Sequence, residues 1–213
     1  MKKLLSLAVL AMMCLQVQAQ IVSSRSSMVT RQVYDEPKSY TGWSTFGIEY
    51  LPSKFSGDGD SESFSGVALN YTNAISLTQS VPLFLEWGLG GQYSFYSEDD
   101  FKIHYASVKV PLNLIYDYQI PGTSINLDPY VGLKARFNVW GEAKEEYYGE
   151  SESWNLFASD EGDWNRFQIG WNIGVKARFN NSFFVGIGYG SDFSEIANDL
   201  KVNEVSISLG LVF

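Results

Sequence analysis

The sequence is poor in the residues that build disulfides, metal sites and catalytic dyads. Its 213 residues include one cysteine, Cys14, and one histidine, His104. A chain with a single cysteine forms no internal disulfide, so its fold depends on a packed core, a metal or a closed hydrogen-bond network. No Cys/His cluster with metal-ligand spacing is present either. We therefore expect no cofactor and no metal ion.

Long apolar runs are also scarce, and the N-terminus contains the longest. It reads MKKLLSLAVLAMMCLQVQAQ, with a mostly apolar run of twelve residues at 4–15. This run is too short for a membrane-spanning helix, which needs roughly 20 residues. Because Val17 and Ala19 stand at the −3 and −1 positions of a small-residue cleavage site, we predict a secretory signal peptide over residues 1–19. A lipoprotein signal through Cys14 is the weaker alternative, because a bulky methionine precedes it.

Basic residues are outnumbered by acidic ones. The chain has 15 Lys and Arg against 24 Asp and Glu, for a formal net charge of −9. Removing the predicted signal peptide removes two lysines, which changes this charge to −11, and leaves 194 residues without cysteine. An acidic chain is a poor nucleic-acid binder, so no nucleic-acid partner is expected. The length suits one large β-domain or one to two ordinary domains.

What the sequence has in abundance is alternation of apolar and polar residues. In STFGIEYL, residues 44–51, Phe46, Ile48 and Tyr50 share one face of an extended chain. The same period of two recurs along the chain, and no convincing helical pattern separates the segments. The eight predicted strands lie at 44–51, 66–72, 83–95, 108–116, 130–138, 167–179, 183–190 and 204–213. An even number of such strands is typical of transmembrane β-barrels.

The predicted connections alternate in character. The first, third, fifth and seventh are mostly polar and acidic, although the third is short and consists mainly of the acidic run 98–100, and the others are less acidic turns. The acidic connections are 52–62, 97–100, 140–165 and 191–201, and the shorter ones are 73–81, 117–125 and 180–182. This pattern predicts short periplasmic turns, external loops and periplasmic N- and C-termini. We divide the chain into a signal peptide (1–19), a periplasmic N-terminal tail (20–39) and an outer-membrane β-barrel domain (40–213).

Alternation alone does not say which face of the strands contacts water. The polar face is rich in glycine, which would weaken strands on a solvated surface but makes room for side chains inside a narrow barrel. The apolar face carries Trp87 and Trp171 with many Tyr and Phe, as the aromatic girdles of membrane barrels require. We therefore predict an all-β fold, an eight-stranded antiparallel transmembrane β-barrel. A soluble barrel with its apolar face inside is the alternative.

The segments YASVKVPLNLIYDY and LDPYVGLKARFNVWGE support this assignment, together with a final strand that ends on Phe213. Over residues 40–213 the sequence resembles the outer-membrane β-barrel domain family of Gram-negative bacteria, which is similar in architecture to OmpA- and OmpX-type barrels. Phe213, with Leu211 and Leu209 at alternate positions, resembles the C-terminal signal that the barrel-assembly machinery reads. The resemblance implies integration into the outer membrane and no shared chemistry.

Two nearly identical heptapeptides fall on the fifth and sixth predicted strands, GLKARFN at 132–138 and GVKARFN at 174–180. Symmetric pairing about the long loop between them places Lys134 near Gly170 and Lys176 near Asp128. We interpret the two copies as the same alternation of apolar and polar residues, which occurs at two different heights along one barrel.

The inward face carries ionisable residues on seven of the eight predicted strands. We estimate the height of each residue by counting from the periplasmic end of its strand. The residues then form a lower group of two acids and two bases and a middle group of three acids and three bases. We call these ten residues the lumen charge network: Glu49, Glu86, Lys109, Asp128, Lys134, Arg136, Lys176, Arg178, Asp192 and Glu204. An ion-pair network that fills the lumen is favoured over a charged permeation path, because open channels need about 16–18 strands.

The external loops hold most of the acidic residues, and the third mixes them with aromatics. Its candidate surface-binding residues are Trp140, Tyr147, Tyr148, Trp154 and Trp164. One interpretation is a solvated acidic rim that divalent cations bridge to lipopolysaccharide phosphates. The other is a recognition surface for an extracellular or envelope protein.

Catalysis has little support in the sequence. His104 and Ser107 are three residues apart, which puts them on opposite faces of a strand, whereas a Ser–His pair on one face needs even spacing. We predict a non-catalytic outer-membrane protein with an envelope-structural or surface-interaction role. Its expected partners are outer-membrane lipid, lipopolysaccharide and the barrel-assembly machinery. An accessory role in envelope biogenesis or secretion is the alternative, followed by a narrow pore or a lipid A-modifying enzyme.

Overall fold

A computed structural model describes residues 40–57, 61–98, 100–147, 150–158, 164–197 and 199–213. The predicted signal peptide and N-terminal tail lie outside these residues. None of the described residues belongs to a helix of the length and apolar character needed to cross a membrane.

In the part of the chain that the structure describes, ten β-strands make up one antiparallel sheet, and eight of them close into a barrel. The eight are β1 (Trp43–Ser56), β2 (Ser61–Ser76), β3 (Leu83–Glu98), β4 (Phe101–Tyr116), β6 (Ile125–Tyr147), β8 (Phe167–Phe179), β9 (Phe183–Asp192) and β10 (Lys201–Val212). The two short strands, β5 (Tyr118–Gln119) and β7 (Glu150–Asn155), both pair with β6. Each barrel strand pairs with the next one along the chain, and β1 pairs with β10 to close the ring. The predicted eight-stranded antiparallel barrel is confirmed.

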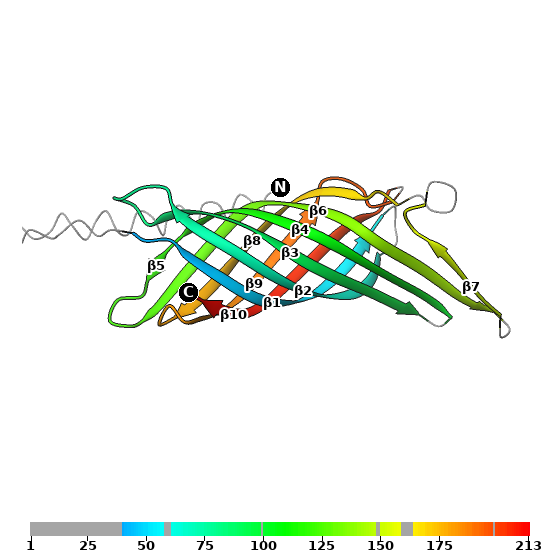
Figure 1. Cartoon of the computed structure of the whole chain (residues 1–213), viewed down its shortest axis with the longest axis horizontal. Helices are drawn as coiled ribbons and strands as arrows, with labels where there is room; N and C mark the ends of the chain where they lie inside the picture. The colour runs from blue at the N-terminus through cyan, green and yellow to red at the C-terminus, as the bar shows by residue number, and fades with distance from the viewer. Residues whose placement is uncertain (1–39, 58–60, 99, 148–149, 159–163, 198) are drawn as a thin grey trace, which may run out of the picture. The chain divides into compact units, whose positions relative to one another are not determined.

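The two ends of the barrel differ in what they carry (Figure 1). We call one the terminal end: the backbones of Ser44 and Phe213 are hydrogen-bonded there, and β5 lies at the same end. The opposite end, which we call the loop end, holds the β1–β2, β3–β4 and β9–β10 connections and the β7 hairpin.

Outward side chains are apolar and inward ones are polar through the middle of the barrel. On β3, Leu89 is 59% exposed, whereas Glu86 is 1% exposed and points into the lumen. An exposed apolar belt of this extent would aggregate in water, but it matches lipid. Closure pairs the backbone groups between strands, as the membrane interior requires.

Several strands are longer than the alternation predicts, so the prediction of a loop over 52–62 is wrong. β1 continues to Ser56 and β2 begins at Ser61. The reason is that the polarity of the two faces inverts near the loop end. There Leu51 and Phe55 point inward and are buried, while Lys54 faces outward and is exposed. This section of the barrel lies in water, so its apolar face turns to the inside.

The same extension of the strands shortens two other predicted loops, 97–100 and 140–165. Residues 97 and 98 belong to β3, and β6 runs on to Tyr147, where it forms a hairpin with β7. The predicted register between the two heptapeptide strands is confirmed, since Lys134 pairs with Gly170 and Asp128 pairs with Lys176.

Candidate functional site

The upper part of the lumen charge network lies below the loop end. Arg136 on β6 bonds to Asp192 on β9, and Lys134 Nζ lies 3.0 Å from Glu204 Oε1 and 3.7 Å from Asp192 Oδ1. A second carboxylate reaches the guanidinium, because Glu204 Oε2 is 3.7 Å from Arg136 Nη1. The four side chains are nearly inaccessible to solvent, so each charge depends on the others for compensation.

One more ion pair completes this layer, and it starts from Lys109, the cross-strand neighbour of Arg136. Lys109 Nζ on β4 lies 2.5 Å from Glu49 Oε2 on β1. The layer therefore holds three basic and three acidic groups, drawn from five strands.

The lower part of the network lies toward the terminal end. Lys176 Nζ is 2.6 Å from Glu86 Oε2, and that carboxylate also accepts hydrogen bonds from Thr72 and Asn113. These four side chains belong to four strands that are not all neighbours, so the bonds cross the lumen.

Arg178 forms the lowest charged contacts. It bonds to Asp128, and its Nη2 lies 3.0 Å from Asp117 Oδ2. Its guanidinium also stacks on Trp43 at 3.7 Å from the ring centroid. Asp117 was missed at the sequence level because it follows β4 in a predicted turn, where side-chain direction has no periodicity to reveal it.

Apolar clusters close the lumen at both ends. The apolar plug at the loop end consists of Phe55, Phe64, Tyr96, Ile103, Tyr105, Ala143, Leu156, Phe157, Ile196 and Val202, with Phe101, Trp154, Trp164 and Leu200 packed against it. The floor cluster at the terminal end consists of Ala74, Phe84 and Ile115, with Tyr40, Trp43 and Tyr130. Between the two clusters, the side chains of Glu86, Arg136 and Asp192 are almost inaccessible to solvent, whereas Glu49 and Lys176 are partly accessible.

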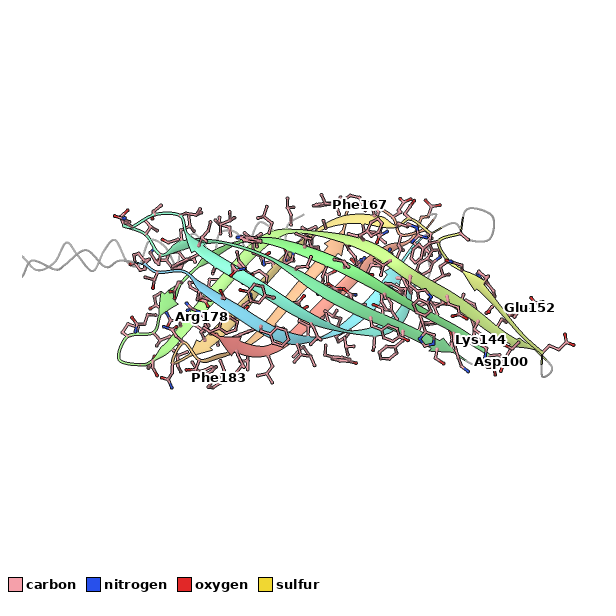
Figure 2. The ribbon with its side chains drawn as sticks, in the orientation of Figure 1. Asp100, Lys144, Glu152, Phe167, Arg178 and Phe183 are labelled. Atoms are coloured by element: carbon pink, nitrogen blue, oxygen red, sulfur yellow. The ribbon has the colours of Figure 1, made fainter. Side chains whose placement is uncertain are left out.

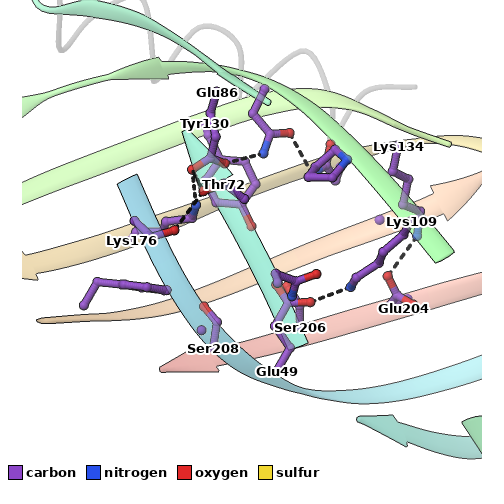
Figure 3. Close-up of a pocket in the computed structure, with 18 of the residues that line it drawn as sticks. Glu49, Thr72, Glu86, Lys109, Tyr130, Lys134, Lys176, Glu204, Ser206 and Ser208 are labelled. Carbon is purple, nitrogen blue, oxygen red and sulfur yellow. Dashed lines mark hydrogen bonds and ion pairs between the residues drawn. The ribbon is translucent and has the colours of Figure 1, made fainter. Parts of the chain in front are cut away.

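A small polar cavity remains between the two layers of ion pairs (Figure 3). Its volume is about 70 Å³, and Glu49, Glu86, Lys109, Lys134, Lys176 and Glu204 are among its lining residues. The side-chain amide of Asn70, which also lines it, has no hydrogen-bond partner among the described residues. This volume suits roughly five water molecules. The cavity is therefore large enough and polar enough to hold ordered water within the network.

Glycines on the inner wall make room for the larger side chains. The Tyr130 hydroxyl lies directly over Gly174 and Gly188, where a Cβ on either residue would overlap it. At Gly190 a Cβ would come within 3.2 Å of Lys134 Nζ. The glycine-rich inner face is thus a packing requirement of this narrow lumen.

The five candidate aromatics of the third loop do not form one exposed surface. Trp154 and Trp164 pack against the apolar plug, where Trp164 contacts Phe55 edge-to-face at 5.7 Å between ring centroids. Trp140 is exposed on the outer wall, at a register shift between β4 and β6. Tyr148 and the side chain of Tyr147 lie outside what the structure describes. Trp154 and Trp164 are therefore partly buried, because one side of each ring packs on the apolar plug. Whether the third loop binds a partner stays a prediction.

The sequence matches the model of the outer membrane protein beta-barrel domain family over residues 5–213. The chain belongs to this family. Among curated proteins there is no significant match.

Solved structures with the same kind of barrel include the attachment invasion locus protein Ail of Yersinia pestis. It is 18% identical, and the alignment covers 82% of this chain and 100% of that chain with a TM-score of 0.49. Neisserial surface protein A is 14% identical, with coverage of 80% and 97% and a TM-score of 0.48. The outer membrane enzyme PagL is 15% identical, with coverage of 77% and 97% and a TM-score of 0.47. Similarity at this level carries nothing about activity.

The C-terminal residues of this outer-membrane barrel sit at its terminal end. Phe213 is 65% exposed on the outer wall, and its backbone N–H and C=O both bond to Ser44. Leu209 and Leu211 are also exposed to the lipid side. The three side chains of the predicted assembly signal therefore form one outward strip over the end of β10 and the residue that follows it.

The single histidine of the barrel faces outward. Its Nδ1 lies 2.9 Å from the Tyr93 hydroxyl, and the two rings stack at 6.0 Å between centroids. Ser107 points inward and donates to Asn138 Oδ1. His104 and Ser107 are therefore on opposite faces of β4. The part of the chain that the structure describes also contains no cluster of three or more His, Cys, Asp or Glu side chains suited to a metal ion.

Proposed function

We propose that this outer-membrane barrel is non-catalytic and acts at the cell surface through its loop end. The observation that carries the proposal is the contrast between its interior and its rim. The lumen is filled by ion pairs and closed by the apolar plug and the floor cluster. Chemistry available to a partner is therefore concentrated on the outside of the loop end.

The recognition element in this proposal is the β6–β7 hairpin. Within the described residues, β7 pairs with β6 alone, so the second edge of residues 150–154 offers backbone N–H and C=O groups to a partner (Figure 1). An open strand edge can accept an extended peptide by strand addition. Glu145 and Glu152 lie directly across from each other on this hairpin, which favours a basic partner. Figure 2 shows Lys144 and Glu152 at this end and Arg178 at the other.

The proposal places the loop end outside the cell and both termini in the periplasm. Two features support this orientation: the longest connection, between β6 and β8, lies at the loop end, and the tight β8–β9 turn lies at the terminal end. The β1–β2 and β3–β4 connections at the loop end are short. Proteolysis of intact cells with a glutamate-specific protease tests this orientation. Cleavage confined to residues 140–165 is expected, and resistance of intact cells with cleavage only after lysis would contradict it.

A photo-crosslinking amino acid placed at position 152 tests the surface role in living cells. We expect covalent adducts with a protein at position 152 and none at position 54, a rim position on β1. Adducts only at position 181, in the β8–β9 turn, would instead favour the accessory role in biogenesis or secretion. The absence of adducts at all three positions would reduce the role to an envelope-structural one.

The non-catalytic part of the proposal has its own test. Lipid A from cells with the protein, without it and with His104→Ala is compared by mass spectrometry. Identical acyl patterns are expected, because His104 is hydrogen-bonded to Tyr93 and Ser107 lies on the opposite face of β4. A pattern that depends on His104 would overturn this assignment.

A further inference from the structure

The lipid-facing wall of the barrel contains a groove near the loop end. Its floor is formed by Gly91 on β3 and Ala106 on β4, and Val67, Leu69, Val108 and Val139 are among the residues of its walls. The groove has a volume of about 560 Å³, and no atom lies within 4 Å of the place where a Cβ on Gly91 would be. Gly91 is flanked on the outer face of β3 by Leu89 and Tyr93, so the depression is local.

Polar groups lie immediately above the groove. Tyr93 pairs across the strands with Ala106, and its hydroxyl is hydrogen-bonded to His104 Nδ1 at 2.9 Å. Both side chains point outward, at the height where the exposed wall changes from aliphatic to polar. Trp140 faces the same way beside Ala106. Aromatic and amphipathic side chains of this kind mark the boundary between lipid tails and headgroups.

Two lysines stand above this boundary. Lys102 on β4 and Lys144 on β6 are direct cross-strand partners on the outer face. Lys102 is four residues beyond Ala106, a rise of about 14 Å along the strand. Both ammonium groups contact the same oxygen of Glu146, at 3.4 Å and 3.2 Å. Like charges directly across a strand pair repel, and one shared carboxylate oxygen compensates them only in part.

We propose that this wall binds one phosphorylated, multiply acylated glycolipid of the outer leaflet. An acyl chain fills the groove over Gly91 and Ala106, the Tyr93–His104 pair meets the ester and sugar groups, and a phosphate lies between Lys102 and Lys144. The order of apolar groove, polar boundary and paired cations matches the order of tails, sugar and phosphate in such a lipid. The assignment to the outer leaflet rests on the proposed function, which places the loop end outside the cell.

A second apolar groove on the same outer wall shows what distinguishes this one. It is of similar size, about 600 Å³, and Ile48, Val175, Ala177, Val185, Ile187 and Ile207 are among its lining residues. Neither groove has a lysine or arginine among its lining residues. The first groove lies below the cross-strand pair of Lys102 and Lys144, whereas the outward lysine on β1 above the second groove, Lys54, has no lysine across from it. The second groove offers room for an acyl chain but no paired cations for a phosphate, so it serves as the internal control.

Native mass spectrometry of the full barrel, refolded in detergent, tests the proposal. The probes are bis-phosphorylated lipid A, dephosphorylated lipid A and phosphatidylglycerol. A one-to-one adduct is expected, with affinity for bis-phosphorylated lipid A about tenfold above that for the other two. Gly91→Leu fills the groove, and Lys102→Ala with Lys144→Ala removes the cations. Each change is expected to weaken binding of the phosphorylated probe about fivefold to tenfold.

Matched controls separate this site from general effects on the barrel. Ala177→Leu fills the second groove, and Lys54→Ala removes an outward lysine on β1; both are expected to bind as the unaltered protein does. Glu146→Gln removes the competing carboxylate and is expected to raise the affinity. A gel shift on heating confirms that each variant is folded.

Three outcomes would overturn the proposal. They are equal binding of all three probes, binding that is unchanged in Gly91→Leu and in the double lysine variant, and a dimer of the barrel in place of a lipid adduct. Binding in detergent does not depend on how the barrel is oriented in cells. A failure here is therefore distinguishable from a failure of the proposed orientation, which proteolysis of intact cells reports.

Discussion

Arg136 on β6 and Asp192 on β9 form a buried ion pair that bridges the strand between them, β8. The two side chains are 2% and 1% exposed. Backbone hydrogen bonds join β6 to β8 and β8 to β9, but not β6 to β9. The ion pair adds a direct bond between β6 and β9, so it ties the three strands together. Lys134 and Glu204 complete the group, so removing one member leaves a charge that water reaches poorly.

We predict that Arg136→Ala lowers the free energy of unfolding by about 3–5 kcal/mol, because it leaves a buried carboxylate without its main partner. Urea-induced unfolding in lipid vesicles, followed by tryptophan fluorescence, measures this change. The apolar double variant Arg136→Met with Asp192→Leu is expected to recover most of the loss. Lys102→Ala, which breaks an exposed pair, is the control and costs at most about 1 kcal/mol. Equal effects of Arg136→Ala and the control would refute the role assigned to the buried group.

Gly188→Ala is expected to lower stability by about 1–3 kcal/mol through overpacking against the Tyr130 hydroxyl. Tyr130→Phe in the same chain removes that oxygen and should return part of the loss. Gly91→Ala, on the outer wall where the added Cβ meets open space, should change stability little. The same unfolding experiment measures all three, and an additive double variant would show that Tyr130 is not the obstacle.

The closed lumen predicts that the refolded protein conducts no steady current in planar bilayers. The ion-pair layers and the two apolar clusters both block the path. Phe157→Ala with Trp164→Ala thins the apolar plug but leaves the ion pairs in place, so this variant should stay closed as well. Stable, large single-channel steps from the unaltered protein would show that the lumen is a pore.

Phe213→Ala is expected to reduce assembly in cells while leaving refolding in detergent unchanged. We propose that the outward strip of Phe213, Leu211 and Leu209 is read by the barrel-assembly machinery, whereas the backbone bonds between residues 44 and 213 need no aromatic ring. The fraction of heat-modifiable protein in the membrane measures assembly. Leu133→Ala, which removes a lipid-facing side chain from β6, is the control. A refolding defect equal to the assembly defect would point to lost packing instead.

Glu146 gives a prediction for pH. Hydrogen bonds from Lys144 and Lys102 hold the pKa of this exposed carboxyl below its usual range. A carboxyl with a depressed pKa contributes stability above its unfolded pKa and loses it as the pH falls through the folded pKa. Carbon-13 NMR titration should therefore show Glu146 titrating at lower pH than it does in Lys144→Ala. An identical titration in the two proteins would remove the lysines as the cause.

Local periodicity explains why so much of the barrel could be predicted from the sequence. A strand alternates its side chains with a period of two, so the residues that face the lumen, such as Glu49 and Lys176, are identified by counting. The pairing of Lys134 with Gly170 followed from counting residues in both directions from the predicted loop at 140–165. The same rule fails near Leu51, where the polarity of the two faces inverts as the wall leaves lipid, and the predicted strand ended too early.

By itself, the sequence determined the antiparallel barrel, its lipid-facing belt and the identity of its inward charges, because each of these follows from neighbours one and two residues apart. Only the tertiary structure decided which charges meet, since Arg136 and Asp192 are 56 residues apart and come together through the closure of the wall. It also decided that Trp154 and Trp164 pack against the apolar plug and that Gly91 leaves a groove. Those outcomes depend on the space between strands, which no local pattern encodes.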